Sequence, residues 1–323
     1  MDPVALFRKR ISDTSLSNRY PGILCVLAHL EQAEGLYSRG TSDREDQYFT
    51  DAVYRANHAF EGMLREAYGL FTGKDATGLN IATIENRLLK DGVFQTRVME
   101  LFKNNRQSWR NPSTHDHTLF FDRVESFLAV QSVSSFVNIL YEQMVEKIAH
   151  DAIQNTIVGP PPAITTAAST ATGRLTNMER VCTFLMNLVD QKASEVSFAI
   201  QSEAEIVGLI HAFLEVAVDV NHVMREPQIG NHKTRLRPDI SFYFENESYI
   251  VDVKHGDYIK SGQVWVETMG KYLIESDIGN AVLVVIGGAR PYDYRVVDRT
   301  LPDRMLRIGV VASRIAIENS GGE

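Results

Sequence analysis

The chain has 323 residues, 44% of them hydrophobic, and its formal net charge is -8 at pH 7. This length favours two domains, and the hydrophobic content is sufficient for each to bury a core. The negative balance excludes a polycation, so a nucleic-acid partner would have to be bound by local basic patches.

Cysteine usage and apolar runs indicate the compartment. Cys25 and Cys182 lie far apart and form no disulfide or metal-binding pattern, which suits a reducing environment. The longest early apolar run, residues 22–30, is too short to cross a membrane and has no signal-peptide cleavage pattern. We therefore expect a cytoplasmic protein with no membrane partner.

Residues from about 20 to 150 have helical periodicity and no strand pattern. Apolar side chains recur on one face of the second segment, for example at Phe60 and Leu64, and Asp43 is a suitable N-cap for it. The predicted helices span residues 23–37, 43–70, 81–89, 93–105 and 119–148. An all-α helical bundle over residues 1–153 is the simplest fold for this region.

A short polar turn, WRNPSTHDH at residues 109–117, precedes the last of these helices. Arg110, Asn111 and His115 resemble the Arg-x4-6-His motif of the HEPN family, and His117 also satisfies its loose spacing. Members of that family are all-helical ribonuclease or nucleotide-binding bundles, in which the Arg and His of two protomers meet across a dimer interface. They cleave RNA without a metal, because histidine can act as general acid or base and arginine can hold the phosphate. The resemblance implies a second site here; a bundle that only dimerises is the alternative.

The composition changes abruptly between residues 154 and 175. Three consecutive prolines, Pro160 to Pro162, favour extended polyproline geometry, and the residues rich in Ala, Thr and Ser that follow cannot build a core. We predict a linker over residues 154–175 and a second domain over residues 176–323.

The second domain opens with two predicted helices, residues 177–190 and 202–214, followed by a strand over residues 220–226. The second helix carries Glu203 and Glu205 in its first turn. Glu203 falls on the face of its apolar side chains, whereas Glu205 lies to one side. The helix dipole alone also favours acidic residues in a first turn, so a structural role stays open for both.

Two alternating segments rich in β-branched and aromatic residues follow, residues 237–244 and 248–254, and the three residues between them predict a hairpin turn. In the second strand Asp252 and Lys254 point to the same face. The register is open by one residue. In one of the two registers Asp239 joins this face, and two carboxylates and an ammonium meet on a half-buried sheet.

Charges within an apolar strand need partners or a metal. Carboxylate oxygens suit Mg²⁺, which can lower the pKa of a bound water and neutralise charge on a phosphate. Lys254 could then orient that water or stabilise the transition state. A salt bridge between Asp252 and Lys254 on an edge strand, beside an ordinary turn at Asp239, explains the same residues without a metal.

The pattern Pro238-Asp239, a gap of 12 residues and Asp252-Val253-Lys254 resembles the signature of the PD-(D/E)XK nuclease superfamily. The core of that superfamily is a helix carrying a glutamate, a strand, the PD strand, the DXK strand, a second helix and a further strand. The elements predicted here follow the same order.

This second resemblance implies an α/β restriction-endonuclease-like domain with a mixed central sheet. It implies Mg²⁺, with Mn²⁺ as a substitute, bound by Asp239, Asp252 and Glu203. Glu205 is the second choice for the helix carboxylate. Lys254 is implied as the catalytic lysine that assists the attacking water.

A helix predicted over residues 263–273 follows the hairpin, and strands over residues 281–286 and 308–312 complete the domain. In the superfamily the helix after the DXK strand often brings a Gln or Lys to the site. Gln263 is the candidate in this chain.

Basic residues precede the hairpin at Lys233, Arg235 and Arg237, against the acidic average of the chain. They could bind the phosphates of a nucleic acid near the metal. An ordinary solvated loop has the same composition, so both interpretations stay open.

Together the two resemblances imply a Mg²⁺-dependent endonuclease that hydrolyses phosphodiester bonds, with DNA favoured over RNA because most members of the superfamily act on DNA. They suggest a bacterial restriction or antiviral defence setting, a homodimer, and partner proteins of a defence system. The alternative is metal-independent cleavage of RNA at Arg110 and His115, with the second domain as a nucleic-acid-binding module.

Overall fold

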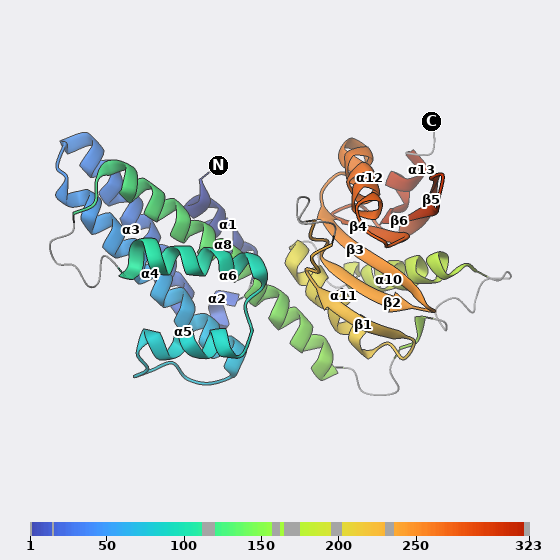
Figure 1. The fold of residues 1–323 in the computed structure, drawn as a ribbon, viewed down its shortest axis with the longest axis horizontal. Coiled ribbons are helices and arrows are strands. Elements are labelled where there is room, and N and C mark those ends of the chain that lie inside the picture. Colours follow the sequence, from blue (N-terminus) through green and yellow to red (C-terminus); the bar gives the residue numbers. More distant parts are fainter. Residues whose placement is uncertain are drawn as a thin grey trace. The chain divides into compact units, whose positions relative to one another are not determined.

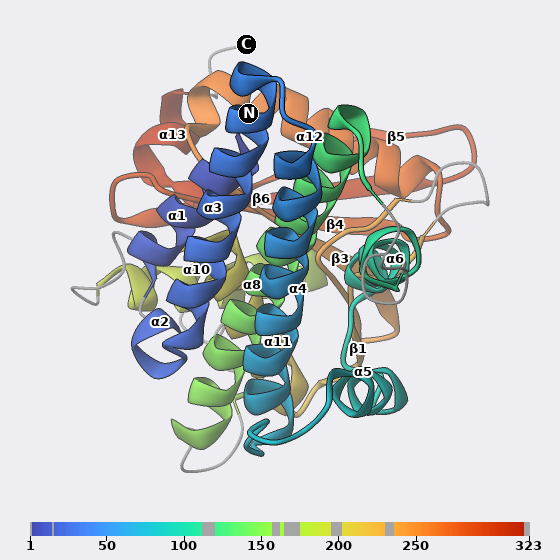
Figure 2. The same cartoon turned by 90° about the vertical axis from the view of Figure 1, so that its left-hand side faces the viewer.

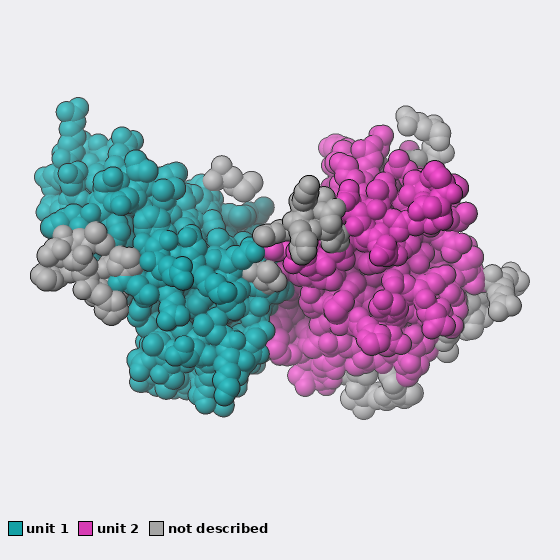
Figure 3. Space-filling model, viewed as in Figure 1, with its two compact units in different colours: residues 1–145 teal, residues 146–323 magenta. Residues whose placement is uncertain are grey.

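The computed structural model describes residues 2–14, 16–111, 120–156, 162–164, 175–194, 202–229 and 236–319. The chain divides into two compact units, residues 1–145 and residues 146–323 (Figure 3). A helical region is followed by an α/β region with a six-stranded mixed sheet, which confirms the predicted fold class (Figure 1). Most of the predicted linker, residues 157–161 and 165–174, lies outside the described residues.

The regular elements in the described part of unit 1 are all helices. Its elements are α1 (Pro3–Asp13), α2 (Leu16–Arg19), α3 (Gly22–Asp43), α4 (Gln47–Thr72), α5 (Ile81–Lys90), α6 (Thr96–Asn105), the π-helix η1 (Arg106–Arg110) and the first part of α8 (Arg123–Thr156). α1 is an addition to the predicted helices. Asp2 caps it by accepting hydrogen bonds from the N–H groups of Val4 and Ala5 at 2.9 and 3.1 Å. No helix in the described part of the chain is both long and apolar enough to cross a membrane.

Aromatic side chains from three helices meet in the core of unit 1. The ring of Phe60 on α4 lies 4.8 Å from that of Phe136 on α8 and 5.8 Å from that of Phe102 on α6. All three are fully buried, and burial of each contributes roughly 1.5–3 kcal/mol. α3 packs along α4 (Figure 2). The bundle therefore has its own hydrophobic core.

Unit 2 contains the sheet. Its elements are the end of α8, α10 (Asn177–Ala193), α11 (Glu203–Val216), β1 (Val220–Arg225), β2 (Ile240–Phe244), β3 (Glu247–His255), α12 (Tyr258–Ile274), β4 (Asn280–Ile286), β5 (Tyr292–Thr300), β6 (Met305–Ser313) and α13 (Arg314–Asn319). The strands lie in the order β1-β2-β3-β4-β6-β5. β3, β4 and β6 are parallel neighbours, and the remaining pairs are antiparallel.

β5 is absent from the predicted strands. Charged residues such as Asp293, Arg295 and Asp298 hide its alternation in the sequence. The structure explains their presence, because β5 is the last strand of the sheet and pairs only with β6 among the described strands. Charged side chains are common on edge strands, where they remain in water and discourage pairing with another chain.

Helices cover both faces of the sheet (Figure 1). α10 and α11 pack on the face that carries Val251 and Val253, whereas α12 and α13 pack on the face that carries Ile250. Because side chains alternate along a strand, Asp252 and Lys254 share the face of Ile250 and α12.

The turn between β2 and β3 fixes the register of the hairpin. It has two residues, Glu245 and Asn246, with φ of 49° and 64°. Two positive φ values in succession are typical of the type I′ turn, whose twist matches that of the strands. Ile240 therefore lies opposite Val251, and continuing the register places Asp239 opposite Asp252.

Candidate metal centre at the central hairpin

Asp239 lies where β2 begins, and its side chain and main chain are both held in place. Asp239 Oδ2 accepts a hydrogen bond of 2.7 Å from the N–H of Val253 on β3. Its carbonyl oxygen accepts bonds from Arg225 Nη1 at 2.7 Å and from the N–H of Glu226 at 2.9 Å. Of the two registers left open by the sequence, the structure has the one that brings Asp239 to Asp252.

Asp252 and Lys254 form a close ion pair on β3. Lys254 Nζ lies 2.7 Å from Asp252 Oδ2, and it also donates to the carbonyl oxygen of Val253 at 3.0 Å. The Asp252 side chain is only 5% exposed, whereas that of Lys254 is 30% exposed. The carboxylate is therefore deep in the site, and the ammonium lies nearer to solvent.

Burial and a neighbouring carboxyl group set the protonation of this pair. Burial, and then the negative charge of Asp239, raise the pKa of Asp252 to about 7. Burial alone would lower the pKa of Lys254, but the charges of Asp252 and Asp239 outweigh it and raise that pKa. Lys254 is therefore charged at neutral pH, and Asp252 is poised between its two forms.

Glu203 is the first residue of α11, and it reaches the end of β3. Glu203 Oε1 accepts a hydrogen bond of 2.7 Å from the N–H of His255. The charge of Glu203 also contributes to the raised pKa of Lys254. The helix N-terminus therefore adds a third carboxylate beside Asp239 and Asp252.

Glu205 caps the N-terminus of α11. It forms a capping box with Ser202, in which the Glu205 carboxylate accepts from the Ser202 N–H at 2.8 Å and the Ser202 hydroxyl accepts from the Glu205 N–H at 3.3 Å. Its hydrogen bonds therefore serve the start of α11. The Ser-x-x-Glu spacing at residues 202–205 is visible in the sequence and could have assigned this role.

The donor set fits a hard divalent cation. Asp239, Asp252 and Glu203 offer carboxylate oxygens without sulfur or imidazole ligands, which is the set that Mg²⁺ prefers. Burial and the negative charge of Asp239 raise the pKa of Asp252 and so favour its protonated form. A cation between these two groups would replace that proton and relieve the repulsion of the two negative charges. The chemistry of these three donors therefore suits the Mg²⁺ ion that the sequence suggests.

α12 contributes a tyrosine that the sequence analysis missed. Burial, and then the charge of Asp252, raise the pKa of Tyr272. Tyr272 packs on the face of the sheet that carries Ile250, which is also the face of Asp252. Gln263, the residue predicted for this helix, is exposed and donates to Glu267 Oε1 at 3.5 Å. Since the two positions are nine residues apart, they lie on opposite sides of an α-helix. The position of Tyr272 on the buried side of α12 is the signal that could have identified it.

The predicted basic residues are described only in part. Lys233 and Arg235 lie outside the described residues, so their place relative to the site stays a prediction. Arg237 directly precedes Pro238 and is half-buried. This position is two residues before Asp239, the first carboxylate of the site.

In unit 1, Arg110 ends the π-helix η1 and pairs with an acidic residue. Arg110 Nε lies 3.2 Å from Glu61 Oε1 on α4, and Arg110 Nη1 donates to Asn111 Oδ1 at 3.1 Å. His115 and His117 lie outside the described residues. The predicted pairing of Arg110 with a histidine therefore stays a prediction.

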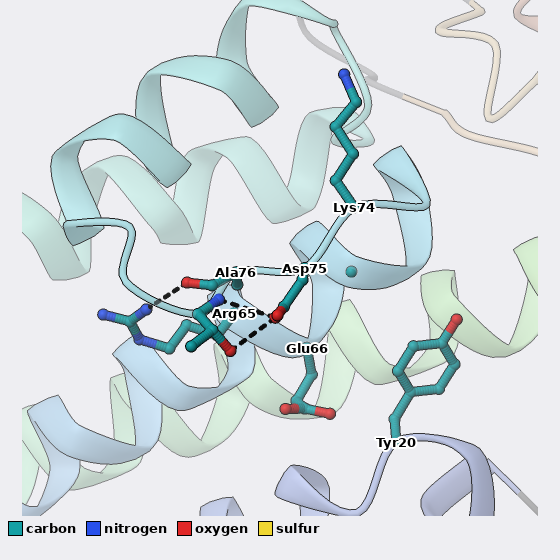
Figure 4. Close-up of a pocket in the computed structure, with 8 residues that line it drawn as sticks. Tyr20, Arg65, Glu66, Lys74, Asp75 and Ala76 are labelled. Atoms are coloured by element: carbon teal, nitrogen blue, oxygen red, sulfur yellow. Dashed lines mark hydrogen bonds between the residues drawn. The ribbon is translucent and has the colours of Figure 1, made fainter.

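A hollow of about 350 Å³ in unit 1 is lined by Tyr20, Glu66 and Lys74, among others (Figure 4). Its polar groups hold the turn after α4. Arg65 Nη1 donates to the carbonyl oxygens of Ala76 and Leu79 at 3.2 and 3.1 Å. Asp75 Oδ1 accepts two hydrogen bonds of 2.8 Å, one from the N–H and one from the hydroxyl group of Thr77. The polar groups that line the hollow therefore have a structural role, which is to stabilise the turn after α4.

Comparison with protein-family models, curated proteins and solved structures gave no match.

Proposed function

We propose that unit 2 is a Mg²⁺-dependent nuclease of the PD-(D/E)XK type that hydrolyses phosphodiester bonds. The observation that carries this proposal is the meeting of Asp239, Asp252, Lys254 and Glu203 where β2 begins, β3 ends and α11 begins. Bound Mg²⁺ would supply a water of lowered pKa and neutralise charge that builds on the phosphate.

The protein groups have distinct roles in this proposal. Asp239 and Asp252 bind the ion, and the bond from the Val253 N–H keeps the Asp239 carboxylate oriented toward the site. Glu203 uses Oε1 for the N–H of His255, which leaves Oε2 to bind the ion or one of its waters.

Lys254 is the electrostatic catalyst of the proposal. In the metal-free site its ammonium neutralises Asp252 at 2.7 Å. With Asp252 bound to an ion, Lys254 would be free to turn to the attacking water or to a phosphate oxygen. Its partial exposure allows this movement, and its raised pKa keeps it charged at neutral pH.

DNA is the proposed substrate because the superfamily that the motif resembles acts mostly on DNA. A homodimer, a role in bacterial defence and partner proteins of a defence system belong to the same proposal, and they rest on the resemblance of both domains. Among the predicted basic residues, Arg237 belongs to the described part of the chain and directly precedes the PD pair, so it is the one proposed to contact the phosphate backbone.

The test is a cleavage assay of the full chain on double-stranded DNA and on RNA, with Mg²⁺ or with EDTA. We expect DNA cleavage only with Mg²⁺, and a loss of at least about 10²-fold in Asp252→Ala. Asp298→Ala is the matched control, because Asp298 is an exposed aspartate on β5 in the same unit. Equal Mg²⁺-dependent cleavage by both variants would contradict the proposal.

The same assay separates the alternative activity. RNA cleavage in EDTA that is lost in His115→Ala and retained in Asp252→Ala would replace the proposal with a metal-independent ribonuclease in unit 1. DNA cleavage that survives His115→Ala supports the site in unit 2.

A further inference from the structure

A second cluster of side chains lies in unit 2, on the later turns of α11. His211 and Glu215 are one turn apart on this helix, and both face His150 on the last turns of α8. His150 Nε2 lies 2.6 Å from Glu215 Oε2, and His211 Nε2 lies 3.4 Å from Glu215 Oε1. The two imidazole rings are 5.2 Å apart, between centroids.

A glycine brings the two helices close enough for these contacts. A Cβ atom placed on Gly208 would lie 2.3 Å from the backbone oxygen of Glu146, so only glycine allows this approach of α11 to α8. Residues three and four positions apart share one face of a helix. His150, four residues after Glu146, therefore meets His211, three residues after Gly208.

Neighbouring groups orient the cluster. His150 Nδ1 lies 3.4 Å from Asp151 Oδ1, and Gln154 Nε2 donates to Glu215 Oε2 at 3.4 Å. A carboxylate on the second nitrogen of a ligating histidine is the usual outer partner in metal sites, where it fixes the tautomer. The side chains of His150 and His211 are 21% and 16% exposed, so an ion could reach them from solvent.

We propose that His150, His211 and Glu215 bind a divalent ion of the zinc class. One ligand atom from each of the three residues lies within 4.8 Å of the others. Zn²⁺ binds His nitrogens and carboxylate oxygens at about 2.0–2.2 Å, so small side-chain rotations would complete three corners of a tetrahedron. Two imidazoles and one carboxylate favour a transition metal over Mg²⁺, which selects oxygen ligands.

The ion would join the end of α8 to α11 and leave one position for water. It would replace the hydrogen bond between His150 and Glu215. This proposal does not depend on the nuclease proposal, because its ligands differ from Asp239, Asp252 and Glu203.

The first experiment measures Zn²⁺ binding by the full chain after removal of metal with a chelator. Calorimetry is carried out with excess Mg²⁺ and in an Asp252→Asn background, so that the carboxylate site does not contribute. We expect one Zn²⁺ per chain and a loss of affinity of at least about 10-fold in His211→Ala. His222→Ala is the matched control, because the ring of His222 on β1 packs against Tyr243 and is not one of the three ligands, and we expect unchanged binding.

A second variant keeps the proposal testable if His211→Ala fails to fold. His211→Cys supplies a thiolate that can ligate zinc, so we expect it to retain one Zn²⁺ and, with Co²⁺, to show the visible absorption of a tetrahedral site. Absence of Zn²⁺ binding by the parent chain would overturn the proposal. Equal affinity in His211→Ala and His222→Ala, or a folded His211→Cys that binds none, would overturn it too.

Discussion

Two clusters lie at the two ends of α11, and burial shifts the pKa of a key residue in opposite directions in them. At the start of the helix, burial raises the pKa of Asp252 to about 7, which favours a protonated carboxyl group. Further along, burial lowers the pKa of His211 to about 4, which favours a neutral imidazole. Burial disfavours the charged form in both places. A metal at the first cluster must therefore displace a proton at neutral pH, whereas the second already has its imidazole in the ligating form.

The largest expected effect that sharpens this comparison is that of Lys254→Met. We expect a loss of Mg²⁺-dependent cleavage of about 10²–10³-fold, because a charge aimed at the transition state is removed. Mg²⁺ binding should persist, since the lysine competes with the ion for Asp252. Single-turnover rates at saturating Mg²⁺, together with calorimetric Mg²⁺ affinity, measure the two effects. Lys271→Met, at an exposed position of α12, is the control; an unchanged rate in Lys254→Met would refute the assigned role.

The next prediction concerns the pH dependence of stability without metal. The pKa of Asp252 is about 7 when folded, against a reference value of 3.8, so the folded state binds more protons between pH 4 and 7. Its contribution to stability is complete below pH 4 and is lost as the pH rises through 7. As the pH rises from about 4 to 7, the free energy of unfolding of Asp252→Asn should increase relative to that of the parent by about 1.4 kcal/mol for each pH unit. Urea unfolding in EDTA at pH 5 and pH 8 measures this gain.

His211 provides the counterpart with the opposite sign. Its pKa is about 4 when folded, against a reference value of 6.5, so its contribution is complete above pH 6.5 and is lost as the pH falls through 4. His211→Asn should therefore lessen the loss of stability at acid pH, in the same urea experiment. If the free energies of unfolding of Asp252→Asn and His211→Asn changed with pH in the same direction, the two pKa shifts could not have opposite signs.

The smallest expected effect concerns the contact between the helices. Gly208→Ala should destabilise the protein by about 1–3 kcal/mol, because the new Cβ would overlap the backbone oxygen of Glu146. It should also weaken Zn²⁺ binding, since the helices that carry the ligands must separate. Gly35→Ala on α3 meets no atom within 4 Å and should be stabilising by about 1 kcal/mol. Thermal unfolding and Zn²⁺ titration of both variants test this; equal effects would exclude the close approach.

The sequence predicted the hairpin and its charged face because alternation over Tyr249 to Lys254 is a local property. It left the register open, because that depended on how many residues formed the turn. The structure has a two-residue turn at Glu245 and Asn246, both with positive φ, and this places Asp239 with Asp252. Asparagine and a short turn are compatible with that geometry, but the glutamate gives no such signal.

The histidine cluster could not be predicted in the same way. His150 lies on α8, far along the chain from His211 and Glu215 on α11, so no ligand spacing is visible in the sequence. Only the spacing of His211 and Glu215, one helical turn apart, is local. The cluster depends on the packing of two helices at Gly208, and a glycine within a helix does not reveal what will contact it.

The division between the two units within α8 has a consequence for dissecting the protein. A fragment that starts after the predicted linker, at residue 176, would lack Glu146, which is the ion-pair partner of Arg225. Arg225 in turn donates to the carbonyl oxygen of Asp239 at 2.7 Å. Such a fragment would retain every proposed Mg²⁺ ligand, but it would lose Glu146, which positions Arg225 against the main chain of Asp239. A fragment that keeps these contacts of unit 2 therefore begins at or before residue 146.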